Sequence, residues 1–477
     1  MKLKKLSAVL AIILCACSTP FIQTNAVEEF SENNLADVIT LHKWLKGQGN
    51  LDNWKKFDYN HDEKINIFDF VLMKKSIFKS AKPIISPASV ELSKDMQSQE
   101  VTGKQADESF INGQTKFAVE LLQNAVNESE AGQNIMVSPY SVVQALGMTA
   151  NGANGETKTQ MEQTIGSMPL EDLNQYLYTQ RNSQPNDETC KLLTANSIWV
   201  RDEEERIQVK EEFLQTNADY YNASVFKAPF DDSTVSDINN WVKKNTDNMI
   251  PELLEEISDD TVMYLINAVT FDGKWLTPYT EDEVWNGIFT SADNSEQEVE
   301  MMHSDEYHYL EDENTTGFMK YYQGNRYAFV ALLPNEDISI NNYIANLTPE
   351  SLQNLIANPK RTSVQAGLPK FSYDYEIELS ETLSSMGMPV AFNPSADFSK
   401  MADTQSGLLY IDNVLHKTHI DVFEEGTKAA AVTSVAMTDE CAVFYEKTVI
   451  LDRPFVYAIV DTDTNLPMFM GVLNSVE

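Results

Sequence analysis

Oxygen-bearing side chains recur at regular intervals in an early stretch of the chain, FDYNHDEKINIFD, which begins at Phe57. Counted from Asp58, they occupy loop positions one, three, five, nine and twelve, and position seven offers a backbone carbonyl. Calcium prefers six to eight oxygen ligands and is bound by loops with this spacing. We therefore expect the loop to bind one calcium ion. The expected ligands are Asp58, Asn60, Asp62, Lys64, Asn66 and Asp69.

One position of this loop departs from the usual pattern. Position six is commonly glycine because the chain turns sharply there, but in this sequence it is Glu63. A residue with a side chain adopts the left-handed conformation at a cost of about 1–2 kcal/mol, so we expect a weakened calcium affinity. The alternative is an acidic, solvated turn that binds no metal.

A second stretch, EEGTKAAAVTSVAM, has no large side chain before its last residue, Met437. Three consecutive alanines favour a helix, but β-branched and aromatic residues follow and favour strands. In a strand, alternate side chains share a face, and one face would carry only small, uncharged groups. Such a segment can slide between two existing strands, whereas the alternative is an ordinary alanine-rich helix. The first face holds Thr427, Ala429, Ala431 and Thr433, and the second holds Lys428, Ala430, Val432 and Ser434.

The charge balance and the missing motifs disfavour several classes of function. The chain has 35 basic and 72 acidic residues and a net charge of −37, which disfavours nucleic acids and anionic membranes as partners because both are polyanions. Only six histidines are present, and no G-x-S-x-G, HExxH, P-loop or GxGxxG motif has a supporting context. A glycosidase needs two carboxylates, but no particular pair stands out among so many acidic residues. We expect a protein that is not an enzyme.

The N-terminus predicts export. Three lysines precede an apolar run from Leu6 to Cys17, which has the length of a secretory signal peptide and is too short to span a membrane. We expect residues 1–26 to be removed, and the letters LCAC within the run leave a lipoprotein signal as the alternative. After removal only Cys190 and Cys441 remain, so no disulfide framework is expected.

The length of 477 residues suggests two or three domains. Residues 34–79 contain the calcium loop and resemble a dockerin, the module that attaches secreted enzymes to the cohesins of a cellulosome scaffold. The first calcium loop of a dockerin is missing, because AVEEFSEN occupies its place. Residues 80–105 contain two prolines and five serines and predict a linker. Four residues lie at the positions where dockerins meet cohesin, and the alternative is that they belong to the core. They are Ile67, Phe68, Met73 and Lys74.

Residues 106–477 mix helices and strands without regular βαβ alternation, which predicts an α+β domain. One expected helix, DESFINGQTKFAVELLQNAV, places Phe110, Phe117, Leu121 and Leu122 on a single face. Several expected strands are apolar on both faces and should be central in a sheet. Further helices are expected over 171–178 and 238–257, and strands over 192–200, 261–271, 326–334 and 454–473.

Several short motifs in this domain resemble those of serpins and occur in the order typical of that family. The resemblance covers essentially all of residues 107–477. It implies the serpin fold, with three β-sheets, about nine helices and an exposed reactive-centre loop. The motifs are Asn134-Ile-Met-Val-Ser138-Pro139-Tyr-Ser141, Asn267-Ala-Val-Thr-Phe271-Asp-Gly273-Lys274-Trp275, Leu368-Pro369-Lys370-Phe371, Ala396-Asp397-Phe398-Ser399, Ile411-Asp412-Asn-Val-Leu-His416-Lys417 and Asp452-Arg-Pro454-Phe455.

The resemblance identifies the small-residue stretch as the hinge of the reactive-centre loop. A serine protease that attacks the loop forms an acyl-enzyme, and the freed hinge inserts as a new strand and carries the protease with it. The usual family spacing places the reactive bond at Glu440-Cys441, which suits a glutamate-specific protease. Cleavage after Met437 or Cys441 would suit a subtilisin-like or chymotrypsin-like protease. The expected hinge residues are Glu424, Gly426, Thr427, Ala429, Ala430, Ala431 and Thr433.

The resemblance also implies polar residues beneath the centre of the large sheet and a tryptophan where the hinge enters it. These residues are Ser138, Ser141, Asn196, His416 and Trp275. We therefore expect a secreted, monomeric suicide inhibitor of serine proteases that is attached to a cellulosome through a cohesin. The alternatives are a non-inhibitory serpin with a carrier or structural role and, with less support, a dockerin-borne glycoside hydrolase.

Overall fold

The computed structural model describes residues 35–47, 50–51, 54–59, 64–67, 69–73, 89–202, 207–258, 261–405, 409–427 and 446–476. The chain forms two units, Met1–Ile85 and Ser86–Glu477. The predicted signal peptide, the reactive bond Glu440-Cys441 and the hinge positions from Ala429 to Thr433 lie outside the described residues.

The small unit contains helix α2 (Leu35–Leu45) and the 3-10 helix η2 (Trp54–Phe57). Its core consists of Leu41, Phe57, Tyr59 and Met73. Met73 is completely buried, which favours the core alternative for this residue over a cohesin contact, because a flexible thioether fills gaps in a small core. Ile67 is half-buried, and Phe68 and Lys74 lie outside the described side chains.

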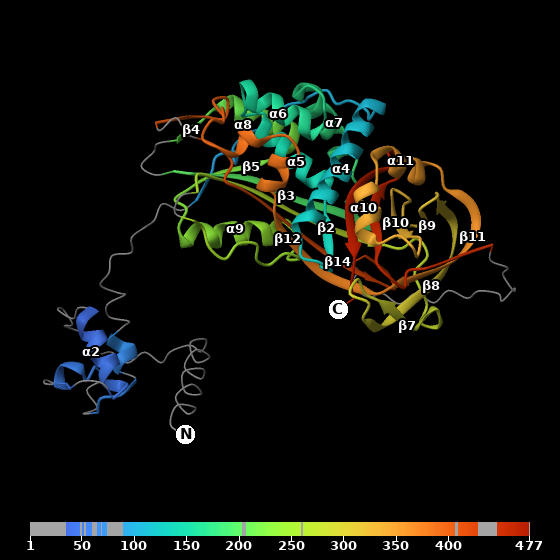
Figure 1. Cartoon of the computed structure of the whole chain (residues 1–477). Helices are drawn as coiled ribbons and strands as arrows, with labels where there is room; N and C mark the ends of the chain where they lie inside the picture. The colour runs from blue at the N-terminus through green and yellow to red at the C-terminus, as the bar shows by residue number, and fades with distance from the viewer. Residues whose placement is uncertain are drawn as a thin grey trace. The chain divides into compact units, whose positions relative to one another are not determined.

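In the large unit, α4 begins at its N-cap Asp107, whose carboxylate accepts a hydrogen bond from the backbone of Phe110. The predicted helix is α4 in Figure 1. Its predicted apolar face is confirmed, because Phe110, Phe117, Leu121 and Leu122 are all buried. The helices are α4 (Glu108–Glu128), α5 (Pro139–Ala150), α6 (Gly155–Ile165), α7 (Leu170–Asn182), α8 (Glu211–Tyr221), α9 (Asp232–Asn245), α10 (Ile340–Asn346), α11 (Pro349–Ala357), α12 (Ser380–Ser385), η3 (Glu281–Glu283) and η4 (Pro389–Phe392).

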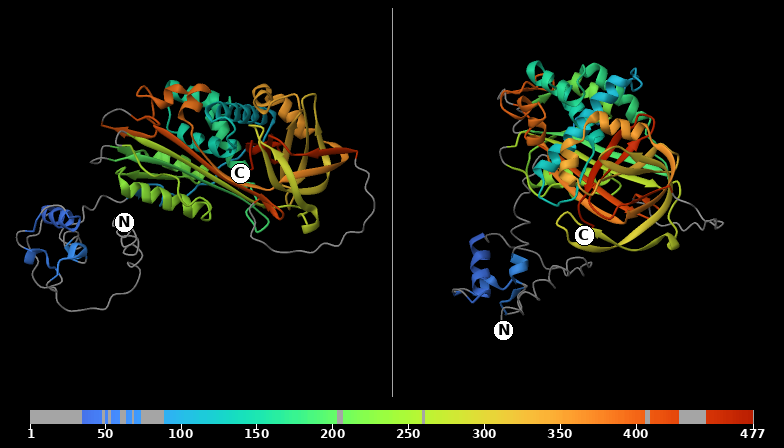
Figure 2. Two further views of the ribbon diagram at one scale, coloured as in Figure 1. Left: turned by 60° about the horizontal axis from the view of Figure 1, so that its bottom comes forward. Right: turned by 45° about the vertical axis from the view of Figure 1, so that its right-hand side comes forward.

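A seven-stranded sheet forms the centre of the large unit. Helices α4 to α8 lie on one of its faces and α9 on the other (Figure 2). Residues Ala195, Trp199 and Ile266 belong to the core cluster beneath α9. In spatial order the strands are β1 (Val90–Glu91), β5 (Ser224–Ala228), β3 (Cys190–Arg201), β6 (Met263–Lys274), β15 (Gly426–Thr427), β14 (Asn413–Phe423) and β12 (Phe371–Glu378).

A nine-stranded sheet packs beside it and supplies much of the main core. Its strands β10 and β18 are buried along their whole length, which agrees with the predicted central strands. A third, two-stranded sheet pairs β13 (Ala402–Thr404) with β4 (Ile207–Val209). The strands of the second sheet are β16 (Lys447–Ile450), β11 (Lys360–Pro369), β8 (Glu296–Glu311), β9 (Thr315–Tyr321), β10 (Tyr327–Pro334), β17 (Phe455–Asp461), β18 (Leu466–Leu473) and β2 (Ile135–Val137), with β7 (Val284–Thr290) paired to β8.

Two sequence predictions need correction. The helix expected over 238–257 ends at Asn245, because Asp247 and Asn248 adopt positive φ angles of 48° and 64° and the Asn239 side chain accepts hydrogen bonds from the backbone of the following segment at Leu253 and Leu254.

The predicted linker is too long. Strand β1 pairs with β5, and the backbone of Gln99 donates to Asp219 at 2.7 Å, so residues 89–105 belong to the large unit. An edge strand such as β5 offers free backbone groups to any extended segment beside it, and this segment uses them.

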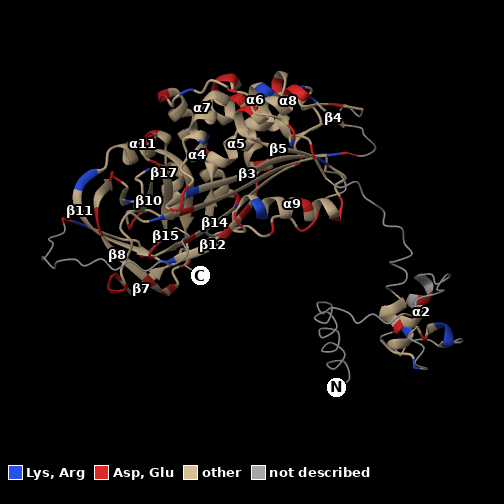
Figure 3. Cartoon of the chain, turned by 180° about the vertical axis from the view of Figure 1, so that it is seen from behind, with Lys and Arg blue, Asp and Glu red and all other residues tan. Residues whose placement is uncertain are grey.

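Acidic side chains gather on the helices that cover the large sheet. Acidic positions are red on α7, α8 and α9 in Figure 3. The first turns contain Glu171 and Asp172 in α7, Glu211 and Glu212 in α8, and Asp232 in α9. Carboxylates are favourable in the first turn because the helix dipole is positive there. These five carboxylates therefore lie where they stabilise their helices locally.

Candidate functional site

The central feature of the large sheet is a short strand wedged into one end of it. Strands β6 and β14 pair directly and in parallel from Asn413 to His419. Beyond this ladder β15 lies between them and pairs antiparallel with both, so that Thr427 faces Val422 on β14 and Gly273 on β6. The sheet is thus open at one end and closed below it.

Backbone groups hold the turn that leads into β15. The Trp275 amide donates to the carbonyl of Glu425 at 2.9 Å, and the Tyr279 amide donates to the carbonyl of Glu424 at the same distance. A Cβ atom on Gly426 would lie 2.1 Å from the Gly273 carbonyl oxygen. Only glycine therefore fits at the point of entry.

Thr427 is buried, with 1% of its surface exposed, and its hydroxyl lies 2.7 Å from the hydroxyl of Tyr322. Tyr322 stacks on Trp275, whose ring nitrogen donates to the carbonyl of Phe423 at 2.9 Å. Thr427 therefore faces inward, as its place in the small-residue row predicts. The expectation that the hinge inserts once the protease has attacked needs correction at Gly426 and Thr427, which already pair within the sheet of the intact chain because such small residues fit the gap there.

Charged groups surround this entry point. The Lys370 ammonium forms ion pairs with Glu424 and, at 3.2 Å, with Glu300. Partial burial acts to lower the pKa of Lys370, but its hydrogen bonds to these two carboxylates outweigh burial and raise it. The turn before β15 is thus tied to β12's side of the sheet by a charge-assisted contact.

A second lysine is buried beneath the entry point. Lys320 lies 4.2 Å from the centre of the Tyr279 ring and 5.6 Å from that of Trp275, and it pairs with Glu306 at 3.0 Å. Burial opposes its charge, yet the nearby Tyr279 and Glu306 raise its pKa above the usual value. A cation held over two rings supports the aromatic stack on which Thr427 rests.

A buried polar network lies under the closed part of the seam. His416 on β14 accepts a hydrogen bond from the backbone of Ser138 at 3.0 Å through Nε2, and its Nδ1 contacts Oδ1 of Asn267 on β6. Asn267 in turn donates to Oγ of Ser141 at 2.6 Å and to Asn196 at 2.5 Å. The network therefore joins β14, β6 and β3 to the start of α5.

His416 is neutral in this network. Its side chain is fully buried, and desolvation lowers its pKa from 6.5 to about 3. Because Nε2 accepts a hydrogen bond, the proton must reside on Nδ1, from which it is donated to Asn267. A protonated ring would place an unpaired N–H against the Ser138 amide.

Comparison with known proteins identifies the family. A family model described as Serpin (serine protease inhibitor) matches residues 112–476. Neuroserpin from Gallus gallus is 30% identical over 372 residues, which are 74% of this chain and 89% of that protein. The chain belongs to the serpin family.

Solved serpin structures agree with this assignment. The thermophilic serpin tengpin in its native state is 48% identical, with a TM-score of 0.78 over 81% of this chain and 100% of that one. The same serpin in its latent state gives a TM-score of 0.70 over 79% of this chain, so the present conformation is more similar to the native one. A complex of thyroxine-binding globulin with thyroxine has 26% identity and a TM-score of 0.68, covering 77% of this chain and 99% of that one.

The structure brings together the predicted site residues that it describes at the large sheet. Ser138, Ser141, Asn196 and His416 meet in the buried network, and Trp275 lies at the entry point with Gly426 and Thr427. Serpins are protease inhibitors rather than enzymes, in agreement with the expectation that this chain is not an enzyme.

Asn267 is at the centre of the network, and the sequence analysis quoted it in a motif without assigning it this role. An asparagine in the otherwise apolar strand TVMYLINAVTF was the available signal, since a buried amide needs partners. Tyr322 and Lys320 gave no such signal, because their partners lie on distant segments, with Thr427 105 residues from Tyr322.

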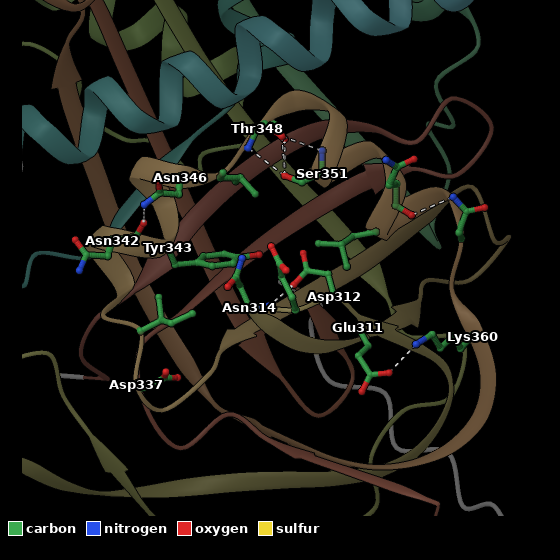
Figure 4. Close-up of a pocket in the computed structure, with 16 residues that line it drawn as sticks. Glu311, Asp312, Asn314, Asp337, Asn342, Tyr343, Asn346, Thr348, Ser351 and Lys360 are labelled. Carbon is green, nitrogen blue, oxygen red and sulfur yellow. Dashed lines mark hydrogen bonds and ion pairs between the residues drawn. The ribbon is translucent and has the colours of Figure 1, made fainter.

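A wide pocket of about 1310 Å³ lies elsewhere on this serpin, between α10, α11 and the turn joining β8 to β9. Its wall carries amide and carboxylate side chains, among them Asn314, Asn342 and Asp312, and Glu311 pairs with Lys360 at 2.6 Å (Figure 4). Polar and apolar groups contribute about equally to its wall, whereas small-molecule carrier sites are mostly apolar with a few polar groups. The pocket therefore does not by itself favour the carrier alternative.

Replacing Thr427 with arginine should expel β15 from the serpin sheet. The new guanidinium would be buried against Tyr322 without a carboxylate partner, so the strand should leave and its contacts should be lost. We expect unfolding to become about 1–3 kcal/mol easier and the Trp275 amide, now without Glu425 as acceptor, to exchange faster with deuterium. Thr427→Val, which keeps the shape, is the control. Unchanged exchange in Thr427→Arg would contradict the observed position of β15.

The buried His416 should make this serpin sensitive to acid. Because its pKa is lower in the folded state, the unfolded chain gains a proton between pH 6.5 and about 3 that the folded chain does not. Stability is therefore lost as pH falls through this window, by up to about 1.4 kcal/mol per pH unit. His416→Gln removes this contribution, so urea unfolding should show the stability difference between variant and wild type shrinking as pH falls. A difference independent of pH would rule out the neutral assignment.

Proposed function

We propose that this protein is a suicide inhibitor of serine proteases that acts by cleavage of its reactive-centre loop and insertion of the hinge as a new strand. One observation carries the proposal: β15 already occupies the open end of the seam, while β6 and β14 pair directly below it. For the residues after Thr427 to insert, only the remaining ladder between β6 and β14 must separate. Serpins generally act on serine proteases as monomers, and this proposal follows that pattern.

The exchange of ladders supplies the driving force. Insertion breaks one parallel ladder between β6 and β14 and forms two antiparallel ladders, one on each side of the new strand. Each net hydrogen bond is worth about 0.5–1.5 kcal/mol, so a strand of this length contributes on the order of 10 kcal/mol before side chains pack. The Ala429, Ala431 and Thr433 side chains, which would face the core, are small enough to enter.

Insertion also explains how the protease would be inactivated. Fourteen residues separate Gly426 from Glu440, and at about 3.3 Å per residue they move a protease attached there by roughly 46 Å. A protease pulled against the body of the inhibitor loses the alignment of its oxyanion hole, which deacylation requires. The acyl-enzyme therefore persists and the inhibitor is consumed.

A non-inhibitory serpin is the main alternative. Thyroxine-binding globulin is a structural relative whose complex with a small molecule is known. The small inward-facing hinge residues favour inhibition, since bulky or charged groups there would stop insertion. Incubation with subtilisin, trypsin, chymotrypsin and a glutamyl endopeptidase tests the proposal: a protease–inhibitor complex that survives a denaturing gel supports it, and quantitative loop cleavage without any complex contradicts it.

The reactive bond determines which protease is trapped. If Glu440 fills the specificity pocket, Glu440→Arg should shift inhibition from a glutamyl endopeptidase to trypsin, because it reverses the charge without changing the hinge. The second-order inhibition rates with both proteases provide the measurement, and Lys428→Arg, on the opposite hinge row, is the control. An unchanged preference would move the reactive bond to Met437 or Cys441, which mass spectrometry of the released peptide would identify.

We propose that the small unit is a calcium-binding dockerin that attaches the exported protein to a cohesin of a cellulosome scaffold. Among its described ligand candidates, Asp58 and Asp69 are buried, and the Asp69 carboxylate accepts hydrogen bonds from the backbones of Tyr59 and Asn66, both at 2.8 Å. Two buried carboxylates on a loop whose candidate ligands are all oxygen atoms fit calcium. No helix in the described ranges is long and apolar enough to cross a membrane.

Calcium-dependent attachment and inhibition should be separable. Asp58→Ala combined with Asp62→Ala should abolish calcium-dependent binding to a cohesin and leave protease inhibition intact, because the loop and the hinge belong to different units. Glu63→Gly, which relieves about 1–2 kcal/mol of backbone strain, should tighten calcium binding about tenfold in calorimetry. Loss of inhibition in the double variant would contradict the separation of the two activities.

A further inference from the structure

A half-buried arginine in the large unit has no ionic partner among the described residues. Arg181 lies in the last turn of α7, and its Nε atom is buried and makes no hydrogen bond. Its guanidinium lies 5.9 Å from the ring of Tyr178. Burial lowers its pKa, and the groups that oppose this effect are tyrosine hydroxyls and not carboxylates. In a chain with 72 acidic and 35 basic residues, a desolvated arginine without a carboxylate indicates a position kept for another anion.

A second unsatisfied donor lines the same cavity. Arg181 and Gln144 of α5 both border a solvent-open pocket of about 480 Å³. Gln144 is 3% exposed, and its amide nitrogen is buried without an acceptor. An unsatisfied buried amide costs about 1–3 kcal/mol, so this one, like Arg181, would gain from an oxygen atom placed in the pocket.

The remaining wall is mostly neutral or positive. Lys94 lies in the turn that follows β1 and borders the pocket, and Thr194 and Asn196 line it from β3. Among the lining residues, all of them described, Glu91 is the one carboxylate, and it already accepts a hydrogen bond from Ser224 at 2.9 Å. The pocket therefore differs in charge from the acidic surface around it.

We propose that this pocket binds a small organic anion, a carboxylate or a phosphate ester, with the Arg181 guanidinium as its counter-charge and Gln144 as a hydrogen-bond donor. Guanidinium groups match both kinds of anion with two parallel hydrogen bonds. The pocket volume lies within the range of small-molecule sites. Lys94 adds a second positive charge at the rim.

The bound anion would tie several elements together. Its neighbours belong to α5, α7, β3 and the segment from Glu91 to Ser98, so binding favours the folded state in which these elements meet. Asn196 is also a member of the network under the seam, through its contact with Asn267. Ligand binding should therefore raise the melting temperature without any protease present.

Calorimetry and thermal unfolding of the full chain test the proposal with inorganic phosphate and citrate as probes, at constant ionic strength. One site per chain should bind one of the two, and saturation should raise the melting temperature by about 2–3 °C. Phosphate without citrate would indicate a phosphate ester as the natural ligand, and the reverse would indicate a carboxylate. Absence of binding by both probes up to about 10 mM would overturn the proposal.

Three variants locate the binding. Arg181→Gln should weaken affinity at least tenfold while the ligand-free chain stays as stable as wild type or becomes more stable, because a desolvated charge has been removed. Lys94→Gln, at an exposed position, should weaken it less and remains informative if Arg181→Gln does not fold. Lys116→Gln removes an exposed charge of α4 outside the pocket and should bind like wild type. Equal affinity in Arg181→Gln and wild type, or equal losses in all three variants, would refute the site.

Discussion

The direct pairing of β6 with β14 is the constraint on which the large unit depends. The two strands come from segments about 150 residues apart, and the contact between His416 and Asn267 crosses the seam between them. Ser138 fixes this contact to the N-cap of α5, so the same histidine that joins the strands also positions a helix above them. Opening the seam must break this network, which leaves buried polar groups without partners and makes a spontaneous opening costly.

His416 and Lys320 are both buried basic side chains, but they differ in how they compensate for the loss of water. His416 gives up its charge and serves as a neutral donor and acceptor, because only uncharged groups face it. Lys320 keeps its charge, because Glu306 and two aromatic rings compensate for the lost water. The neutral His416 ring can accept one hydrogen bond and donate another across the seam between β6 and β14. The charged Lys320 lies against the aromatic residues at the entry point and supports them.

Local sequence patterns predicted the elements whose formation depends on nearby residues. The predicted helix that became α4 lies where its apolar spacing places it, and at α5 the Ser138 N-cap and Pro139 in the first turn are local signals of the same kind. The alternation of small residues predicted that Thr427 faces inward. The end of α9 was missed because two residues with positive φ interrupt an otherwise helical pattern. The pairing of β1 with β5, the burial of Met73 and the contact of Tyr322 with Thr427 depend on tertiary neighbours, which spacing along the chain does not reveal.

In the proposed inhibitory mechanism, the fixed turn before β15 gives strand insertion a defined origin. Because the carbonyls of Glu424 and Glu425 are held by the backbone of Tyr279 and Trp275, the chain cannot enter the seam at an arbitrary point or in an arbitrary register. Insertion would then extend a strand whose first two residues already pair with both neighbours. No separate nucleation step would be needed between cleavage and growth of the strand. Residues close to Thr427 govern how soon the movement begins, and residues farther along govern how far it continues. Under this proposal, a single anchored turn gives insertion one direction and shortens the delay before it begins.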